Sequence, residues 1–345
     1  MHSGRRREDA LPDVFFKQLD LPAPDVDLGV ASGTYIHQTA GMMLGLEREF
    51  QRERPDAVLV FGDINATLAA ALSASQLGIR VGHVEAGLRS GDRVSVGEMN
   101  RVLVDQVSTW LFAPHRDAEA NLRAEGIPAE KIHFVGNTLI DTLVKYRPAA
   151  ARLRLAASMG IADRRYVLVT VHKAANIDSE PHLQSIMYAL LTLADHTDVV
   201  FPAQQRTTQR LKDFGLYEEL AGHARLRLLS PLAYLEFLSL LNDAGAVLTD
   251  SGGVQEEAVV IGVPCVTLRT TTEHPVTLRD GANRLAGGDP HLAIRYISEA
   301  LANGHAPAAI PEGWDGRAAG RIVDVLATDL DGQQLQRRVA QQLRA

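Results

Sequence analysis

Four side chains that can transfer protons each follow an apolar segment of this 345-residue chain. Asp63 follows the segment AVLVFG, Glu85 follows RVGHV, His172 follows LVTV and Asp250 follows AVLT. Carboxylates and imidazoles are common general acids and bases. One acid after a strand is more simply explained as a cap of the next helix. Four such groups at the ends of apolar segments instead indicate a shared site.

The segment LTDSGGVQEEA, residues 248–258, has the pattern of a phosphate-binding helix start. Gly252 and Gly253 would let a ligand approach the backbone, and the free N–H groups at a helix start attract anions. Ser251 adds a hydroxyl donor, and Glu257, a turn further on, could accept hydrogen bonds from a ribose diol. The same letters also fit an ordinary capped helix with a glycine turn. Phosphate binding is therefore a hypothesis that this segment favours but does not establish.

The segment 83–101, HVEAGLRSGDRVSVGEMNR, alternates acidic and basic residues. Its acids are either acid–base groups or members of a salt-bridged loop. Because Glu85 stands at the end of an expected strand, we interpret it as a site carboxylate. We interpret Asp92, Arg93 and Arg101 as framework residues that hold the loop.

The apolar segments alternate with segments of helical length, which is typical of α/β proteins with doubly wound parallel sheets. Most expected strands are continuously apolar, as strands buried on both faces of a sheet are. Such sheets bind ligands at the carboxyl ends of their strands, where the polar groups stand. The expected strands span residues 57–61, 79–84, 109–113, 131–136, 166–172, 198–203, 246–250 and 264–269. The expected helices span residues 65–77, 115–125, 181–195, 233–242 and 252–261.

The length of the chain predicts two domains of roughly 150 residues each. A segment with Pro and Gly and without a strand pattern, residues 148–160, marks the expected boundary. We predict an N-terminal parallel-sheet domain over 1–150, a C-terminal one over 151–325, and a terminal helix over 326–345. The cleft between two such domains is the expected site.

Composition argues against several classes of protein. The formal net charge is −7 and the densest basic run, Arg5–Arg7, is short, so no nucleic-acid partner is expected. The single cysteine, Cys265, stands in the apolar segment VPCVTL and is expected to be a buried core thiol in a reducing compartment. No segment reaches the roughly 18 apolar residues of a membrane span, and the start does not read as a signal peptide. We expect a cytoplasmic protein without a membrane partner.

Metal and cofactor motifs are not found in the sequence. It contains no HExxH or CxxC spacing, so no metal site is predicted. No P-loop and no GxGxxG motif follow a strand, so neither ATP-driven nor nicotinamide chemistry is predicted. We expect no cofactor.

Taken together, the motifs resemble those of the non-hydrolysing UDP-N-acetylglucosamine 2-epimerase family, over nearly the whole chain. The resemblance implies a glycosyltransferase-B-like fold, with two Rossmann-like domains, a cleft between them and a C-terminal helix that packs back on the first domain. It also implies a homodimer and a role in cell-envelope polysaccharide biosynthesis. The motifs that carry it are GD at 62–63, HVEAGLRSGDR at 83–93, NR at 100–101, VTVH at 169–172 and LTDSGGVQEEA at 248–258.

The reaction implied by the resemblance interconverts UDP-N-acetylglucosamine and UDP-N-acetylmannosamine. UDP is eliminated to leave a 2-acetamidoglucal, and is then added again with the opposite configuration at C2. No nicotinamide or metal takes part. A positioned base must take the weakly acidic C2 proton and an acid must return one on the other face, while donors stabilise the departing diphosphate.

The resemblance assigns substrate binding to one set of residues and chemistry to another. Which catalytic carboxylate is the base and which the acid stays open. The substrate-binding set is Ser251, Gly252 and Gly253 at the β-phosphate, Glu257 at the ribose, Phe237 by the uracil, and Arg269. The catalytic set is Asp63, Glu85 and His172, with His172 facing the diphosphate and sugar.

The chain departs from the family pattern at two positions and in one missing segment. The family usually reads PEE before the NR pair, and its first acid is implicated in catalysis, whereas this chain has Gly97 there. His274 stands in TEHP where the family commonly has an arginine. The family's first strand and GTRPE loop have no counterpart here, so the N-terminal domain is expected to lack them.

Two other functions stay open on the sequence. A nucleotide-sugar glycosyltransferase on the same fold would not need the acid that Gly97 replaces. A catalytically impaired UDP-sugar-binding protein would also fit the departures.

Overall fold

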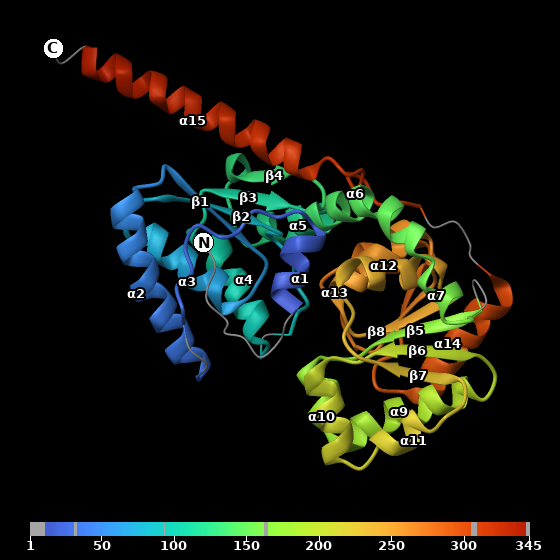
Figure 1. The fold of residues 1–345 in the computed structure, drawn as a ribbon. Coiled ribbons are helices and arrows are strands. Elements are labelled where there is room, and N and C mark those ends of the chain that lie inside the picture. The colour runs from blue at the N-terminus through green and yellow to red at the C-terminus, as the bar shows by residue number, and fades with distance from the viewer. Residues whose placement is uncertain (1–10, 31–32, 93, 162–164, 305–308, 343–345) are drawn as a thin grey trace. The chain divides into compact units, whose positions relative to one another are not determined.

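The computed structural model describes residues 11–30, 33–92, 94–161, 165–304 and 309–342. The basic run Arg5–Arg7 and Arg93 therefore lie outside the described residues. The chain forms two compact units, each built on its own parallel sheet (Figure 1). Among the described residues, unit 1 contains those of 23–141 and 312–342, and unit 2 contains those of 11–22 and 142–311.

Unit 1 holds a four-stranded sheet of order β1-β2-β3-β4, with every neighbouring pair parallel. Its strands are short apolar segments that pack on both faces. The strands are β1 (Ala57–Phe61), β2 (Arg80–Val84), β3 (Trp110–Ala113) and β4 (Ile132–Phe134). The helices are α2 (Tyr35–Glu53), α3 (Asn65–Gln76), α4 (Val96–Val107), α5 (Arg116–Ala124), the 3-10 turn η1 (Ala129–Lys131) and α15 (Ala318–Gln342).

The two faces of this sheet have separate apolar clusters. On one face, Phe50 of α2 packs with Val60 and Val81. On the other, Trp110 and Phe112 pack with Ile322 of α15. Burial of these side chains on both faces explains why the strands read as apolar runs rather than as alternating patterns.

The C-terminal helix α15 belongs to unit 1 and is held there by polar contacts as well. The indole Nε1 of Trp110 donates to Asp329 Oδ2 at 2.6 Å, and Arg321 Nη1 donates to the carbonyl of Val135 at 3.0 Å. Upstream of the helix, Trp314 is 2 % exposed and donates to the carbonyl of Pro114. A helix at the end of the chain was expected, and these contacts show where it packs.

Unit 2 holds a six-stranded parallel sheet of order β10-β9-β8-β5-β6-β7. The strand order reverses between β5 and β8, which is the topological switch point of a doubly wound Rossmann sheet. The strands are β5 (Tyr166–Thr170), β6 (Asp198–Pro202), β7 (Leu226–Leu229), β8 (Ala246–Thr249), β9 (Cys265–Thr267) and β10 (Asn283–Leu285). The helices are α1 (Leu11–Gln18), α7 (Leu155–Ser158), α8 (Ala174–Ile177), α9 (Glu180–Ala194), α10 (Gln205–Asp213), α11 (Tyr217–Ala221), α12 (Tyr234–Asp243), α13 (Gly252–Ile261), the 3-10 segment η2 (Pro275–Gly281) and α14 (Pro290–Asn303).

Residues of β5 point alternately to the two faces of this sheet. Val167 and Val169 join the cluster under α9 and α14, while Tyr166 and Leu168 join the cluster under α12 and α13. Cys265 lies in the second cluster and burial raises the pKa of its thiol to about 12. The expectation of a buried core thiol is thus confirmed.

The segment expected to be the domain boundary, 148–160, is largely helical and lies within unit 2, because the change of unit falls between Asp141 and Thr142. Helix α6 (Thr138–Leu153) contains Pro148 and is followed at once by α7. The strands β7 and β10 were not predicted, because LRLL and NRL are short and carry arginines. In the part of the chain that the structure describes, no helix is both long and apolar enough to span a bilayer.

Candidate active site

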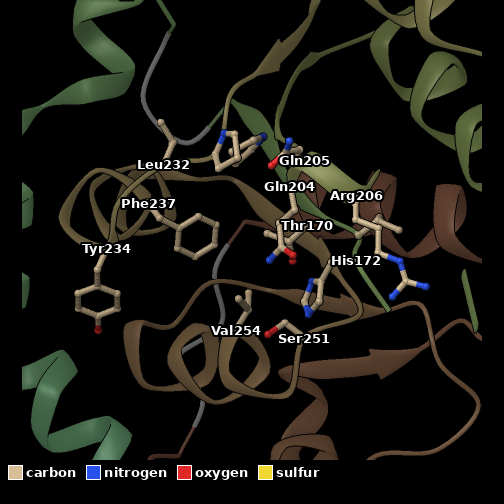
Figure 2. A pocket seen from close by; sticks show the side chains of 13 residues that line it. Thr170, His172, Gln204, Gln205, Arg206, Leu232, Tyr234, Phe237, Ser251 and Val254 are labelled. Carbon is tan, nitrogen blue, oxygen red and sulfur yellow. The ribbon is translucent and has the colours of Figure 1, made fainter. Parts of the chain in front are cut away.

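A cavity of about 360 Å³ opens at the carboxyl ends of β5 and β8, where the strand order of unit 2 reverses. This is the position at which open α/β sheets bind ligands, and the volume suits a small molecule. Figure 2 shows side chains that line it from several separate elements. They include Thr170, His172, Tyr234, Phe237, Ser251 and Val254.

His172 is held in place by Asp250, which follows the neighbouring strand β8. The carboxylate of Asp250 is fully buried and accepts the backbone N–H groups of His172 and Lys173 at 3.0 and 2.9 Å. It also accepts Asn176 Nδ2 at 3.0 Å, and the imidazole Nδ1 of His172 lies 3.2 Å from Asp250 Oδ1. His172 thus lines the cavity while one of its ring nitrogens contacts the buried acid.

The first turn of α13 borders the same cavity through Ser251. Ser251 is the N-cap residue of α13, but its side chain makes no capping hydrogen bond, so its hydroxyl is not used by the helix start. A Cβ added at Gly252 would lie 3.0 Å from Nε2 of His274. His274 in turn places Nδ1 2.8 Å from Glu256 Oε1. The first turn of α13 can therefore present backbone N–H groups to an anion, and His274 leaves little room for a side chain at Gly252.

Glu257 lies on α13 and contacts the cavity wall through Tyr234. The Tyr234 hydroxyl donates to Glu257 Oε1 at 2.8 Å. Burial raises the pKa of the Glu257 carboxyl to about 7; the hydrogen bond from Tyr234 opposes the rise and the charge of Glu256 adds to it. Burial and the Glu257 carboxylate raise the pKa of Tyr234, so its hydroxyl remains a donor at neutral pH. This carboxyl can therefore change its charge near physiological pH.

Two carboxylates follow adjacent parallel strands in unit 1. Asp63 comes two residues after β1, and Glu85 comes directly after β2. Glu85 has a φ of 71°, the left-handed backbone region that non-glycine residues seldom adopt. A Cβ added at Gly62 would lie 3.4 Å from Glu85 Oε2, so the backbone beside Asp63 runs close to the Glu85 carboxylate. Unusual backbone at a polar strand end is common at functional sites.

A buried ionic network supports the backbone around these acids. Asp105 is fully buried, with Oδ1 2.6 Å from Nδ1 of His83, and its Oδ2 accepts Arg89 Nη2 at 2.7 Å. Burial alone would lower the pKa of Arg89, but hydrogen bonds and charge from Glu125 and Asp105 raise it overall. The ring Nε2 of His83 lies 3.0 Å from the carbonyl of Gly62, which ties the network to the loop after β1.

The family model for UDP-N-acetylglucosamine 2-epimerase matches residues 1–327 of the chain. The chain belongs to the UDP-N-acetylglucosamine 2-epimerase family. Curated epimerases of Methanocaldococcus jannaschii and Methanococcus maripaludis are 40% and 39% identical to it, and each alignment covers 94% of this chain and 90% of the relative.

A crystal structure of the Methanocaldococcus jannaschii UDP-GlcNAc 2-epimerase in complex with UDP-GlcNAc and UDP is also similar. It superposes with a TM-score of 0.85 at 38% identity, over 94% of this chain and 91% of that one. A second family member, bound to UDP-GlcNAc, comes from Neisseria meningitidis, with a TM-score of 0.81 at 30% identity over 90% and 87% of the two chains. The chain is therefore an isomerase-family protein with the glycosyltransferase-B-like α/β fold that was expected.

In this epimerase-family chain, the predicted substrate-binding residues divide into three groups. Ser251 and Phe237 line the cavity with His172. Helix α13, for which Ser251 is the N-cap residue, contains Gly252, Gly253 and Glu257. Arg269 is not among the cavity-lining residues; its guanidinium makes two hydrogen bonds with Glu273, at 2.6 and 2.8 Å.

Several contacts around the candidate site were not predicted from the sequence. Asp250 was noted only as a strand end, although its place after β8 was a usable signal. Tyr234, in YLEF, carried no signal, because its partner Glu257 is distant in sequence. Arg101 was interpreted as loop framework, which fits its contact with Glu98; its Nη2 also lies 2.5 Å from Asp63 Oδ2, a contact that was not predicted. Asp92 does act as framework, since its Oδ1 accepts the N–H of Val94.

Proposed function

We propose that this protein is a UDP-N-acetylglucosamine 2-epimerase that interconverts UDP-N-acetylglucosamine and UDP-N-acetylmannosamine. The observation that carries the proposal is the cavity at the β5–β8 switch point, which brings His172 and the start of α13 together. Such a helix start suits a diphosphate. The names and ligands of the relatives point to the same nucleotide sugar.

The proposed reaction proceeds by elimination and re-addition. A carboxylate takes the C2 proton while the C1–O bond to UDP breaks, with its electron pair leaving on the diphosphate oxygen. The product is a 2-acetamidoglucal, and UDP then returns to C1 as a proton is delivered to the other face of C2. The leaving diphosphate carries the developing charge, so donors placed at it lower the barrier.

Each proposed residue has a part that its chemistry allows. Ser251 and the first backbone N–H groups of α13 hold the β-phosphate, and the imidazole of His172, oriented by Asp250, faces the diphosphate. Glu257 accepts the ribose hydroxyls and Phe237 stacks by the uracil. Asp63 and Glu85 supply or support the two proton transfers. For Arg269 we propose a supporting part in substrate binding, exerted through Glu273.

Incubation with UDP-N-acetylglucosamine in heavy water tests the proposal. Proton NMR is expected to show the manno epimer together with loss of the C2 proton signal in both nucleotide sugars. An epimer that forms without deuterium at C2 would contradict the elimination route. Nucleotide sugar consumed only when an acceptor is present would favour a glycosyltransferase, and UDP binding without any turnover would favour an impaired binding protein.

A related substrate is the specific alternative within this reaction class. A relative in Pseudomonas aeruginosa, 38% identical over 87% of this chain, is a UDP-2,3-diacetamido-2,3-dideoxy-D-glucuronate 2-epimerase. Both nucleotide sugars carry a UDP group and an epimerisable C2. Parallel assays with the two sugars decide between them by kcat/KM.

We also propose that the protein acts in the cytoplasm as a homodimer. The single cysteine is a free thiol, which fits a reducing compartment. Unit 1 exposes Leu44 on α2 and Met99 and Leu103 on α4, with 63%, 52% and 42% of each side chain accessible. Exposed apolar side chains of this kind favour association. A mass of one chain in light scattering would contradict the homodimer.

The affinity for UDP is expected to rise about tenfold between pH 6 and pH 8 through Glu257. Its carboxyl has a pKa of about 7 without ligand. The charged form accepts hydroxyl hydrogen bonds more strongly, so nucleotide binding favours deprotonation. The sign follows: affinity grows as pH rises through 7, and binding near pH 7 releases a proton. Isothermal titration calorimetry in buffers of different ionisation enthalpy measures both effects.

Glu257→Gln is the matched control for this prediction. The amide keeps an oxygen for the Tyr234 hydroxyl but cannot ionise, so proton release from the protein should vanish while ionisation of UDP itself remains. Without ligand, the folded state favours the neutral form of Glu257. The stabilising contribution of this carboxyl is therefore fully present below about pH 4.5 and is lost as the pH rises through about 7. The glutamine variant should therefore unfold at higher urea concentration than the parent at pH 8. If both proteins release the same number of protons on binding UDP, Glu257 does not bind the ribose as proposed.

A further inference from the structure

Residue 97 lies against the side chain of Asp63. Gly97 is in the first turn of α4, and a Cβ built on it would lie 2.5 Å from Asp63 Oδ2 and 3.2 Å from Asp63 Cγ. A real Cβ does not approach a carboxylate oxygen this closely. The carboxylate of Asp63 therefore occupies the space that any side chain at position 97 would need.

Arg101, one turn further along α4, holds Asp63 in that space. Its Nη2 lies 2.5 Å from Asp63 Oδ2, and the side chain of Arg101 is only 10% exposed. The neighbouring Asn100 donates from Nδ2 to the backbone carbonyl of Asp63 at 2.8 Å. Asp63 is thus fixed at both its side chain and its backbone by the same helix.

Arg101 is itself fixed by a buried acid. Its Nη1 lies 3.3 Å from Oε2 of Glu98, whose side chain is 6% exposed. The Glu98 carboxylate accepts the backbone N–H groups of Ser90 and Gly91 and the Ser90 hydroxyl, at 2.9 to 3.1 Å. A connected chain of contacts therefore runs from the 90–91 loop through Glu98 and Arg101 to Asp63. Such a chain limits the orientations that the Asp63 carboxylate can adopt.

We propose that Arg101 is a positioning residue for the Asp63 carboxylate, and that glycine at position 97 is what allows this placement. The inference rests on the proposed function, because it assigns Arg101 to the acid that we expect to serve proton transfer. In this view Gly97 is not simply a missing acid, because the absence of a side chain there leaves room for the Asp63 carboxylate. A guanidinium fork can contact Glu98 and Asp63 together, whereas an ammonium group cannot reproduce that geometry.

Gly97→Ala and Arg101→Lys test the proposal by separate routes. The alanine methyl pushes the Asp63 carboxylate off Arg101, and the lysine withdraws the fork without touching residue 97. Each variant is expected to lower kcat by roughly 10–100-fold, because small misplacement of a reacting group has effects of this size. The KM for the nucleotide sugar and the affinity for UDP should stay within about twofold. Gly320→Ala is the matched glycine control, since nothing lies within 4 Å of its added Cβ on α15.

The Asp63→Asn background separates positioning from general structural support. If both residues act through the Asp63 carboxylate, neither variant should lower the residual kcat further in that background. A further loss there, or wild-type kcat in Arg101→Lys, would overturn the proposal. A higher kcat in Gly97→Glu would also overturn it, since position 97 would then require its own acid. If the parent protein itself does not epimerise, the proposed function fails first, so the two failures are distinguishable.

Discussion

Asp63→Asn is expected to lower the rate of C2 deuterium exchange by about 10²–10⁴-fold, the usual contribution of a general acid or base. Asparagine keeps the size of the side chain and an oxygen for the Arg101 contact at 2.5 Å, so the change removes the proton-accepting group with little change of shape. The affinity for UDP should be nearly unchanged, because the cavity proposed for the nucleotide is lined by residues of unit 2. NMR measures the exchange, and calorimetry measures the binding.

Asp324→Asn is the matched control, since this exposed acid lies on α15 in the same unit. This variant should catalyse deuterium exchange at C2 of the nucleotide sugar at the same rate as the parent protein. Starting the reaction separately from each epimer also assigns the two carboxylates. Each epimer carries its C2 proton on one face of the sugar. Loss of the group that takes this proton should slow deuterium incorporation most when the reaction starts from that epimer. Glu85→Gln should then be slowed most from the other epimer. Parent-like exchange in Asp63→Asn from both epimers would exclude Asp63 from proton transfer.

Asp250→Asn is expected to lower the free energy of unfolding of unit 2 by about 2–4 kcal/mol. The buried carboxylate accepts two backbone N–H groups and the amide of Asn176, and it contacts the His172 ring. An asparagine amide turns one acceptor into a donor that faces these donors, and burial leaves no water to compensate. Because His172 loses its orienting partner, kcat should fall as well. Urea unfolding followed by circular dichroism measures the stability.

Asp289→Asn is the control for this change. Asp289 is exposed and caps α14 by accepting the N–H groups of His291 and Leu292. Asparagine caps helices about as well as aspartate, so its effect should stay below roughly 0.5 kcal/mol. If Asp250→Asn unfolds at the same urea concentration as this control, the buried carboxylate does not stabilise unit 2 as its contacts indicate.

Residues near one another in the chain made much of the fold predictable. Eight strands were expected near their observed places, because a buried parallel strand is a short continuous apolar segment that can be recognised in the sequence. The same locality placed Asp63, Glu85, His172 and Ser251 after strands or at a helix start. The unpredicted β7 carries Arg227, whose aliphatic stem and charged end hide the strand pattern.

Contacts between distant segments were beyond the reach of such patterns. Local spacing and residue type were enough to predict the family, the α/β class and the residues that stand at strand ends. The folded chain was needed to show that Arg101 pairs with Asp63, that Tyr234 donates to Glu257 and that Arg269 is engaged by Glu273. An ion pair or a buried hydrogen bond depends on which side chains packing brings within about 3 Å. For that reason the sequence showed Gly97 only as the place of a missing acid, whereas the structure shows that the Asp63 carboxylate occupies the space beside it.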